Sequence, residues 1–129
     1  MELVDIFLDP EDPERHDYTT AVLDEPEGQV QGYVTFGATP LTDGVYDLYW
    51  IAVDPKQQGL GFGQVLLRYV ENEVRREHGR MLLIETSSKT SYASTIRFYE
   101  RAGYTEISRI KDFYRIEDDK VVFCKRLTP

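Results

Sequence analysis

Apolar positions along the chain change their spacing several times, and each change indicates a new element. Alternating apolar residues predict strands at Tyr18–Leu23 and Val30–Thr39, separated by a proline- and glycine-containing turn. The run Val45–Val53 is apolar on both faces, which predicts a strand in the middle of a sheet. Three later strands are predicted at Met81–Thr86, Thr105–Ile110 and Val121–Lys125. The pattern therefore indicates a mixed sheet of about six strands.

Helical spacing occurs between these strands. Apolar residues from Val65 to Val74 recur at about 3.6 positions and predict a helix that continues to about His78, with Gly79 as its C-terminal cap. A second helix is predicted over Tyr92–Ala102, closed by Gly103. Strands before, between and after the helices predict an α/β fold of the α+β kind, with helices flanking the mixed sheet.

Both ends of the chain carry further predictions. Leu3–Leu8 has the spacing of the end of an amphipathic helix, which Pro10 and Pro13 would stop. The last two strands are predicted to be joined through Asp112–Tyr114 and the acidic turn Glu117–Asp119. These elements are expected to form one domain over residues 1–129, a length that suits a single core.

Composition narrows the functional classes. The net charge of −8 disfavours nucleic acid as a partner, because binding phosphates needs a basic face. It is compatible with a cationic substrate such as an amine, or simply with solubility. No window approaches 18 uninterrupted apolar residues and the N-terminus lacks a basic secretory signal, so no membrane span and a cytoplasmic location are expected. One cysteine and two histidines make no metal-ligand set of known spacing.

The hexapeptide Gln58-Gly59-Leu60-Gly61-Phe62-Gly63 lies between the central strand and the first long helix. Glycines let the backbone turn with its amides pointing inward, and a helix start adds unpaired amides and a positive dipole end. This layout predicts a phosphate or pyrophosphate site. A dinucleotide fingerprint is the alternative, but its glycine spacing differs and the chain is too short for a second nucleotide-binding half. A flexible loop is the other alternative.

Two segments, in this order, resemble the GNAT family of acyl-CoA-dependent N-acyltransferases. Ile51–Pro55 followed by Gln58-x-x-Gly61-x-Gly63 is similar to the family's pyrophosphate signature, [Q/R]-x-x-G-x-[G/A]. Phe98–Tyr104 is similar to the family's helix ending, F-Y-x-x-x-G-[F/Y]. The resemblance implies a GNAT-like fold, with acetyl-CoA bound in a V-shaped gap between the strands Val45–Val53 and Met81–Thr86.

The resemblance also implies roles for individual residues. Tyr99 matches a general acid near the sulfur of the cofactor, and Tyr114 is a second candidate for that role. Asp47 and Glu85 are alternative candidates for a base that acts through water, and an ordinary solvated acid is the other interpretation of each. The cofactor would be held by backbone groups of the central strand and by the glycine turn; these residues are Ile51, Ala52, Val53, Gln58, Gly59, Leu60, Gly61, Phe62 and Gly63.

The implied reaction is transfer of the acetyl group of acetyl-CoA to a primary amine, small or peptidic, without a metal. The alternative is a non-catalytic acyl-CoA-binding or regulatory module. Three departures from the family pattern bear on this choice: Tyr92 replaces a common asparagine, Gln58 replaces a common arginine, and the usual first strand and helix are expected to be lacking. An apolar face at Leu3–Leu8 and an open edge on the following strand predict a homodimer.

Overall fold

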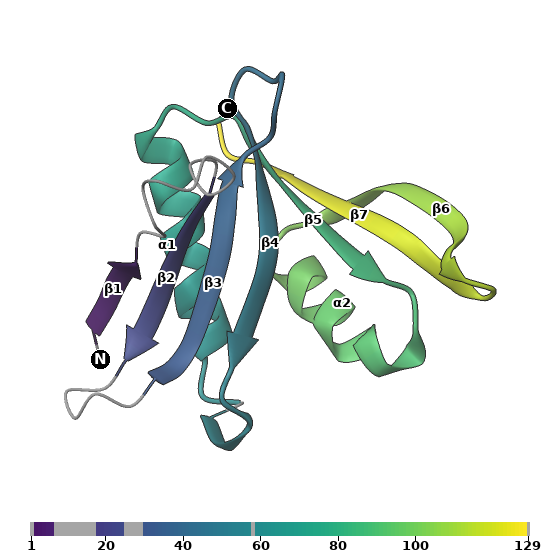
Figure 1. The fold of residues 1–129 in the computed structure, drawn as a ribbon, viewed down its shortest axis with the longest axis horizontal. Helices are drawn as coiled ribbons and strands as arrows, with labels where there is room; N and C mark the ends of the chain where they lie inside the picture. The colour runs from purple at the N-terminus through teal and green to yellow at the C-terminus, as the bar shows by residue number, and fades with distance from the viewer. Residues whose placement is uncertain (1, 7–17, 25–29, 58, 129) are drawn as a thin grey trace.

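The structure is a computed structural model that describes residues 2–6, 18–24, 30–57 and 59–128. Its described strands form one seven-stranded mixed sheet in the order β1-β2-β3-β4-β5-β7-β6 (Figure 1). The strands are β1 (Glu2–Ile6), β2 (Tyr18–Asp24), β3 (Val30–Ala38), β4 (Val45–Val53), β5 (Met81–Ser87), β6 (Thr105–Arg115) and β7 (Asp118–Arg126). The helices are α1 (Phe62–Arg76) and α2 (Ala93–Arg101), with short 3-10 turns at Pro55–Gln57 and Thr90–Tyr92. The prediction of a mixed sheet with flanking helices is confirmed, with β4 at its centre.

The N-terminal segment differs from its prediction. Residues 2–6 form strand β1, which pairs with β2 in antiparallel register from Glu2 opposite Asp24 to Ile6 opposite Thr20. The helix predicted over Leu3–Leu8 is therefore wrong for these residues, while Phe7 and Leu8 lie outside the described residues. The segment is short and holds the β-branched Val4 and Ile6, so pairing with a neighbouring strand decides its conformation. The edge of β2 is covered by β1, which removes that argument for a homodimer.

Strands β4 and β5 run parallel but separate along their length. Their register extends only from Val45 opposite Met81 to Leu48 opposite Ile84. Beyond that point β4 continues to pair with β3, whereas β5 continues to pair with β7 as far as Ser87. A bulge lies in the β3–β4 ladder at the same level, between Leu48 and Trp50. The sheet consequently opens between its two halves, and α2 lies beside the opening (Figure 1).

The end of α1 also differs from its prediction. The left-handed residue is His78, with φ of 63°, and Gly79 does not have a positive φ. Gly79 is needed for a different reason: an added Cβ would lie 2.3 Å from Cγ1 of Val74 and 2.9 Å from the ring of Tyr46. The helix cap predicted at Gly79 is thus wrong, and the glycine instead permits close passage of the chain beneath the helix.

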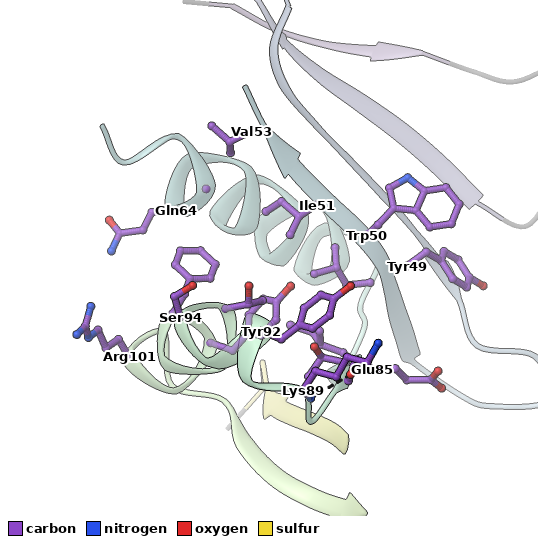
Figure 2. A pocket seen from close by; sticks show the side chains of 18 of the residues that line it. Tyr49, Trp50, Ile51, Val53, Gln64, Glu85, Lys89, Tyr92, Ser94 and Arg101 are labelled. Carbon is purple, nitrogen blue, oxygen red and sulfur yellow. Dashed lines mark hydrogen bonds between the residues drawn. The ribbon is translucent and has the colours of Figure 1, made fainter. Parts of the chain in front are cut away.

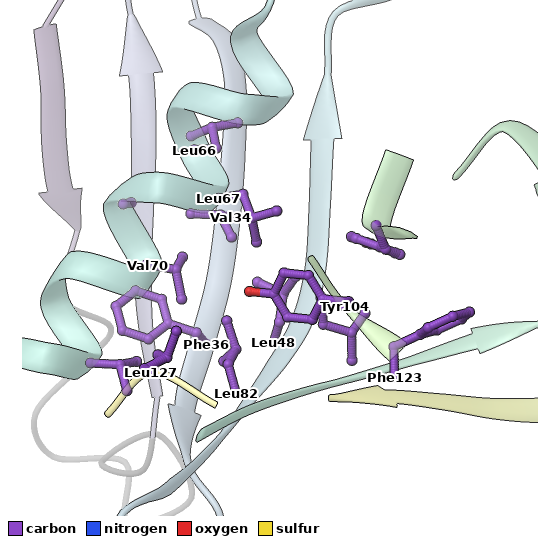
Figure 3. Packing of buried hydrophobic residues seen from close by; sticks show 14 of the residues in the cluster. Val34, Phe36, Leu48, Leu66, Leu67, Val70, Leu82, Tyr104, Phe123 and Leu127 are labelled. Carbon is purple, nitrogen blue, oxygen red and sulfur yellow. The ribbon is translucent and has the colours of Figure 1, made fainter. Parts of the chain in front are cut away.

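One apolar core joins α1 to the sheet. Leu66, Val70 and Val74 are fully buried on the face of α1 that packs against β3 and β4. Figure 3 shows this cluster continuing through Leu82 to Tyr104 and Phe123, toward α2. The near-3.6 spacing of the α1 residues is what places them on one face. No helix in the described part of the chain is both long and apolar enough to cross a membrane.

A buried polar cluster ties the two helices and β7 together. The Tyr104 hydroxyl donates to Oε2 of Glu71 at 2.7 Å, and Nζ of Lys125 lies 3.1 Å from the same oxygen. Lys125 also donates to the carbonyl oxygen of Ala102 at 2.9 Å, at the end of α2. Because Glu71 is buried, these partners compensate for the loss of water around its charge. The cluster fixes the C-terminal end of α2 against α1.

The hairpin of β6 and β7 is longer than predicted. Asp112–Tyr114 belong to β6 and form part of an irregular stretch between Ile110 and Arg115, so they do not connect the two strands. The connection is instead a tight turn in which Glu117 has φ of 68°. Asp118 and Asp119 begin β7. The apolar pattern predicted both strands too short, because the residues at the hairpin end are mostly charged.

Candidate active site

A cleft of about 1080 Å³ opens where β4 and β5 separate. The glycine turn and the start of α1 line one end, and residues from the middle of β4, the end of β5 and β6 line the other. Figure 2 shows Gln64 and Arg101 on one side of this cleft and Tyr49, Trp50 and Glu85 on the opposite side. The volume is slightly above the roughly 300–1,000 Å³ that is usual for small-molecule sites, so the cleft has room for a large cofactor. The parting of two parallel strands thus creates space for an elongated ligand.

The glycine turn presents main-chain groups to this cleft. Gly59 and Gly61 both have left-handed backbones, with φ of 85° and 83°. An added Cβ at either position would meet no atom within 4 Å, so the space above the turn is open. Gly61 is also the N-cap of α1 and no side chain caps it. The first amides of α1 are therefore available to an anion, with the positive helix dipole behind them. Gln58 lies outside the described residues.

Gly63 has a separate packing role. An added Cβ on Gly63 would lie 3.3 Å from Cζ of Phe98 on α2. The two motifs found in the sequence therefore meet in space, the glycine of one against the phenylalanine of the other. A larger residue at this position would push α2 away from α1.

The remaining predicted cofactor residues divide into two groups. Ile51, Val53 and Phe62 line the cleft, with Phe62 packed into the core. Ala52 instead borders a shallow hollow beside Val30 and Tyr33, because neighbouring residues of a strand face opposite sides. Leu60 points into solvent with 63% of its surface exposed. Ala52 and Leu60 could therefore contact a cofactor only through their main-chain atoms.

Tyr99 combines burial with a position on the cleft. It lines the cleft from α2 but is only 4% exposed. Its ring packs against those of Phe98, Tyr104 and Phe123, with centroid distances of 5.5, 6.2 and 6.3 Å. Burial raises the pKa of Tyr99 to about 12. The hydroxyl consequently stays protonated at neutral pH and can act as a hydrogen-bond or proton donor.

The two candidate bases lie in different surroundings. Glu85 lines the cleft and pairs with Nζ of Lys120 at 3.3 Å. Asp47 does not line the cleft, and its Oδ2 accepts a hydrogen bond from Thr39 at 2.8 Å. Burial is the main factor that raises the pKa of Asp47, and the charge of Glu85 adds to it, while Thr39 and Lys120 act in the opposite direction. The two carboxylates are near enough to interact, but only Glu85 faces the cleft.

Tyr114 completes the group of predicted residues that share the cleft. It lies on β6 and is 47% exposed. The structure thus brings Tyr99, Glu85 and Tyr114 to the same cleft as the glycine turn, from three separate elements. Tyr92, which departs from the family pattern, also lines the cleft and is exposed.

Several lining residues were not found from the sequence. Tyr49 and Trp50 line the cleft and are 41% and 55% exposed. The sequence had instead predicted that β4 is buried on both faces. Charged residues missed in the same way are Lys89, Arg101, Arg115 and Asp118. Asp118 is buried, accepts a hydrogen bond from Ser87 and lies 3.8 Å from Nζ of Lys89. No group of three or more potential metal ligands occurs among the described residues.

The sequence of this chain is similar to those of known acetyltransferases. The family model described as "Acetyltransferase (GNAT) domain" matches residues 16–106. The S-(2-succino)cysteine N-acetyltransferase of Bacillus subtilis is 29% identical over 84 residues, which are 62% of this chain and 51% of that protein. The ribosomal protein bS18-alanine N-acetyltransferase of Escherichia coli K12 is 32% identical over 73 residues, 57% of this chain and 48% of that protein. The chain thus spans about half the length of these relatives.

Solved structures agree with the sequence matches. A protein from Desulfovibrio desulfuricans assigned to the GNAT family of acetyltransferases superposes with a TM-score of 0.84 and 44% identity, over 87% of this chain and 71% of that one. The Escherichia coli ribosomal-protein-S18-alanine N-acetyltransferase superposes with a TM-score of 0.76 at 21% identity, over 88% and 72%, which supports the fold alone. The family match covers most of the chain and the same motifs surround the cleft. The chain therefore belongs to the GNAT acetyltransferase family.

Proposed function

We propose that this protein is an acetyl-CoA-dependent N-acetyltransferase that transfers the acetyl group directly to a primary amine. The observation that carries the proposal is the continuity of one cleft from the open glycine turn to the buried, protonated Tyr99. An anion site would hold the phosphorylated carrier of a thioester, and a proton donor in the same cleft would assist departure of its thiol.

Acetyl-CoA fits the residues that are present. The amides of Gly59–Gly63 would bind the pyrophosphate, and open space above Gly59 and Gly61 lets a phosphate approach the main chain. Past Leu48 strand β4 no longer pairs with β5, so main-chain groups at Ile51 and Val53 would bond the pantetheine arm as an added strand. The co-substrate supplies an activated acetyl group as a thioester.

The chain's own residues then assist the transfer. The amine nitrogen forms a bond to the acetyl carbonyl carbon as the carbon–sulfur bond breaks. Glu85, at the end of β5, would accept the proton that the amine loses, directly or through a water. Tyr99 would donate a hydrogen bond or a proton to the departing thiolate, and Tyr114 is the alternative donor. Asp47 lies outside the cleft lining, so it would not contact the amine directly.

Two measurements on the purified protein test this proposal. Acetyl-CoA should raise the melting temperature, since a ligand at about 100 times its dissociation constant stabilises folding by roughly 2.7 kcal/mol. NADH should give no comparable rise. Free thiol should then be released from acetyl-CoA only when an amine is added, which a screen of small amines and peptides would reveal. Binding without amine-dependent release would instead identify a non-catalytic acyl-CoA-binding module.

A further inference from the structure

Two neighbouring aromatic side chains stand exposed on the cleft. Tyr49 and Trp50 are 41% and 55% exposed, and their ring centroids are 6.3 Å apart with an interplanar angle of 56°. Tyr18 packs its ring edge-on against Tyr49 at 5.8 Å and supports it from β2. Exposed aromatic rings of this size are common in surfaces that bury a partner or ligand.

The bulge in β4 explains why these two consecutive residues are both exposed beside the cleft. Consecutive residues of a regular strand face opposite sides of the sheet. Here Leu48 pairs with Phe36 and Trp50 pairs with Thr35, so Tyr49 is the extra residue of the bulge. Bulges re-aim side chains in this way and often lie beside active sites. Both residues line the cleft as a result.

These rings lie at the end of the cleft where an acceptor would meet the thioester. Figure 2 shows Tyr49 and Trp50 away from Gln64 and Arg101, which lie toward the glycine turn. The last paired residues of β4 and β5 are Leu48 and Ile84, so Tyr49 and Glu85 come directly after the point where the strands part. An aromatic wall and a carboxylate therefore flank the same end of the cleft.

The charges of the described lining argue against a polycation. It carries two carboxylates, Glu85 and Asp118, and three cations, Lys89, Arg101 and Arg115. Both carboxylates already have a lysine partner, Lys120 for Glu85 and Lys89 for Asp118. The net charge of −8 of the whole protein is therefore not concentrated in the cleft. Glu85 stays 54% exposed beside its Lys120 partner, so one ammonium group can be accommodated there, whereas further ammonium groups would meet the cations of the lining without a free carboxylate.

We propose that Tyr49 and Trp50 form an aromatic wall that selects amines carrying one ammonium group next to a flat apolar ring, as in the arylalkylamines. This inference rests on the proposed function. The ring of the acceptor would pack against the Tyr49 and Trp50 rings, which provide apolar area and favourable edge or offset contacts. The ammonium group would lie toward Glu85, with the Trp50 ring face as a further attractive surface for its charge.

A matched pair of amines tests the selectivity. With acetyl-CoA saturating, kcat/KM for 2-phenylethylamine should exceed that for propylamine roughly tenfold or more, and should also exceed that for spermidine, because an apolar wall discriminates by the surface it buries. Trp50→Ala should lower the phenylethylamine-to-propylamine ratio about tenfold, and Trp50→Phe should restore part of it. Tyr33→Ala is the control, since Tyr33 is 40% exposed on the same sheet but does not line the cleft; it should keep the ratio.

Trp50 offers a second readout that needs no turnover. It is the single tryptophan of the chain, so intrinsic tryptophan emission reports on this wall alone. In the presence of CoA, 2-phenylethylamine should cause a saturable change in emission, and propylamine at the same concentration should not. This binding titration decides the inference even if no amine is acetylated, in which case only the proposed function fails.

Three results would overturn the inference. One is a phenylethylamine-to-propylamine ratio near one in the wild-type protein. Another is a Trp50→Ala variant that is folded, by its melting curve, and keeps the wild-type ratio. The last is a preference for spermidine together with no change in tryptophan emission when phenylethylamine is added.

Discussion

The two ends of the cleft are built from different parts of the chain. At one end the groups offered to a ligand are main-chain amides of Gly59–Gly63, held by two left-handed glycines and an uncapped helix start. At the other end they are side chains from three elements: Tyr49 and Trp50 on β4, Glu85 on β5 and Tyr114 on β6. A main-chain site recognises a feature that every acyl-CoA shares, whereas a side-chain site can vary with the acceptor.

Tyr99 lines the cleft from α2, and loss of its hydroxyl should have the largest effect. Tyr99→Phe should lower kcat roughly 10²-fold or more while the dissociation constant of acetyl-CoA changes little, because only the proton donor is lost. Steady-state kinetics together with calorimetric titration of acetyl-CoA would separate the two quantities. Tyr114→Phe is the matched comparison. Activity that survives in Tyr99→Phe and collapses in Tyr114→Phe would assign the acid role to Tyr114.

The pKa of Tyr99 adds a pH criterion to that experiment. Since burial raises it to about 12, Tyr99 stays protonated throughout the neutral and mildly alkaline range. The wild-type kcat should therefore show no alkaline decline from this group below about pH 10.

At the glycine end, charge should matter more than shape. Gly61→Asp places a negative charge where the phosphates approach, and losing a single charge-assisted hydrogen bond already costs about 1.5–3 kcal/mol of binding. The dissociation constant of acetyl-CoA should therefore rise by a factor of about 10 to 100. Gly61→Asn has nearly the same shape and also tolerates a positive φ, so it is the control. Equal affinities for the two variants would place the anion site elsewhere.

Gly63 tests whether the glycine end depends on the packing of α2. Gly63→Val would overfill the space in front of Phe98, because even an added Cβ would lie only 3.3 Å from its ring. The free energy of unfolding should fall by about 1–3 kcal/mol, as for other overpacked sites. Denaturant titration measures it, and Val65→Ala, at an exposed position on the same helix, serves as a control for general helix effects. A Gly63→Val protein as stable as the wild type would show that the two motifs pack independently.

The sequence predicted the glycine-turn end of the cleft better than the end formed by side chains. The strands β3, β4 and β5 are encoded by contiguous apolar residues, and the structure confirms them. The glycine turn and Tyr99 were found from short motifs and both line the cleft, while their roles stay predictions. The aromatic wall could not be predicted, because a bulge that depends on the β3–β4 register exposes Tyr49 and Trp50. Asp47 matched a family position in the sequence, yet the pleat of β4 leaves it outside the cleft lining. Local periodicity likewise misassigned residues 2–6, which tertiary pairing with β2 makes a strand.

The smallest expected effect is on stability and comes from Asp47, which lies near Glu85 but outside the cleft lining. Its pKa in the folded protein lies above 3.8, mainly through burial, so the folded state binds this proton more tightly than the unfolded state. Asp47 therefore contributes stability at acid pH that is lost as the pH rises through its folded pKa. Asp47→Asn removes the titration and keeps an acceptor for Thr39. The free energy of unfolding of the variant minus that of the wild type should therefore be larger at neutral pH than at acid pH. Denaturant titrations at both pH values measure this difference, and the opposite trend would contradict the assignment.

The central claim is that the acetyl group passes directly to an amine in the cleft between β4 and β5. The most direct test is to quantify, by mass spectrometry, the N-acetylated amine and the free CoA formed from acetyl-CoA and 2-phenylethylamine or the best amine of the screen. We predict equal amounts of the two products with the wild type and with Gly61→Asn, and far less of both products with Gly61→Asp when acetyl-CoA is kept below the raised dissociation constant of that variant. CoA release without acetylated amine, or undiminished product with Gly61→Asp, would contradict the claim.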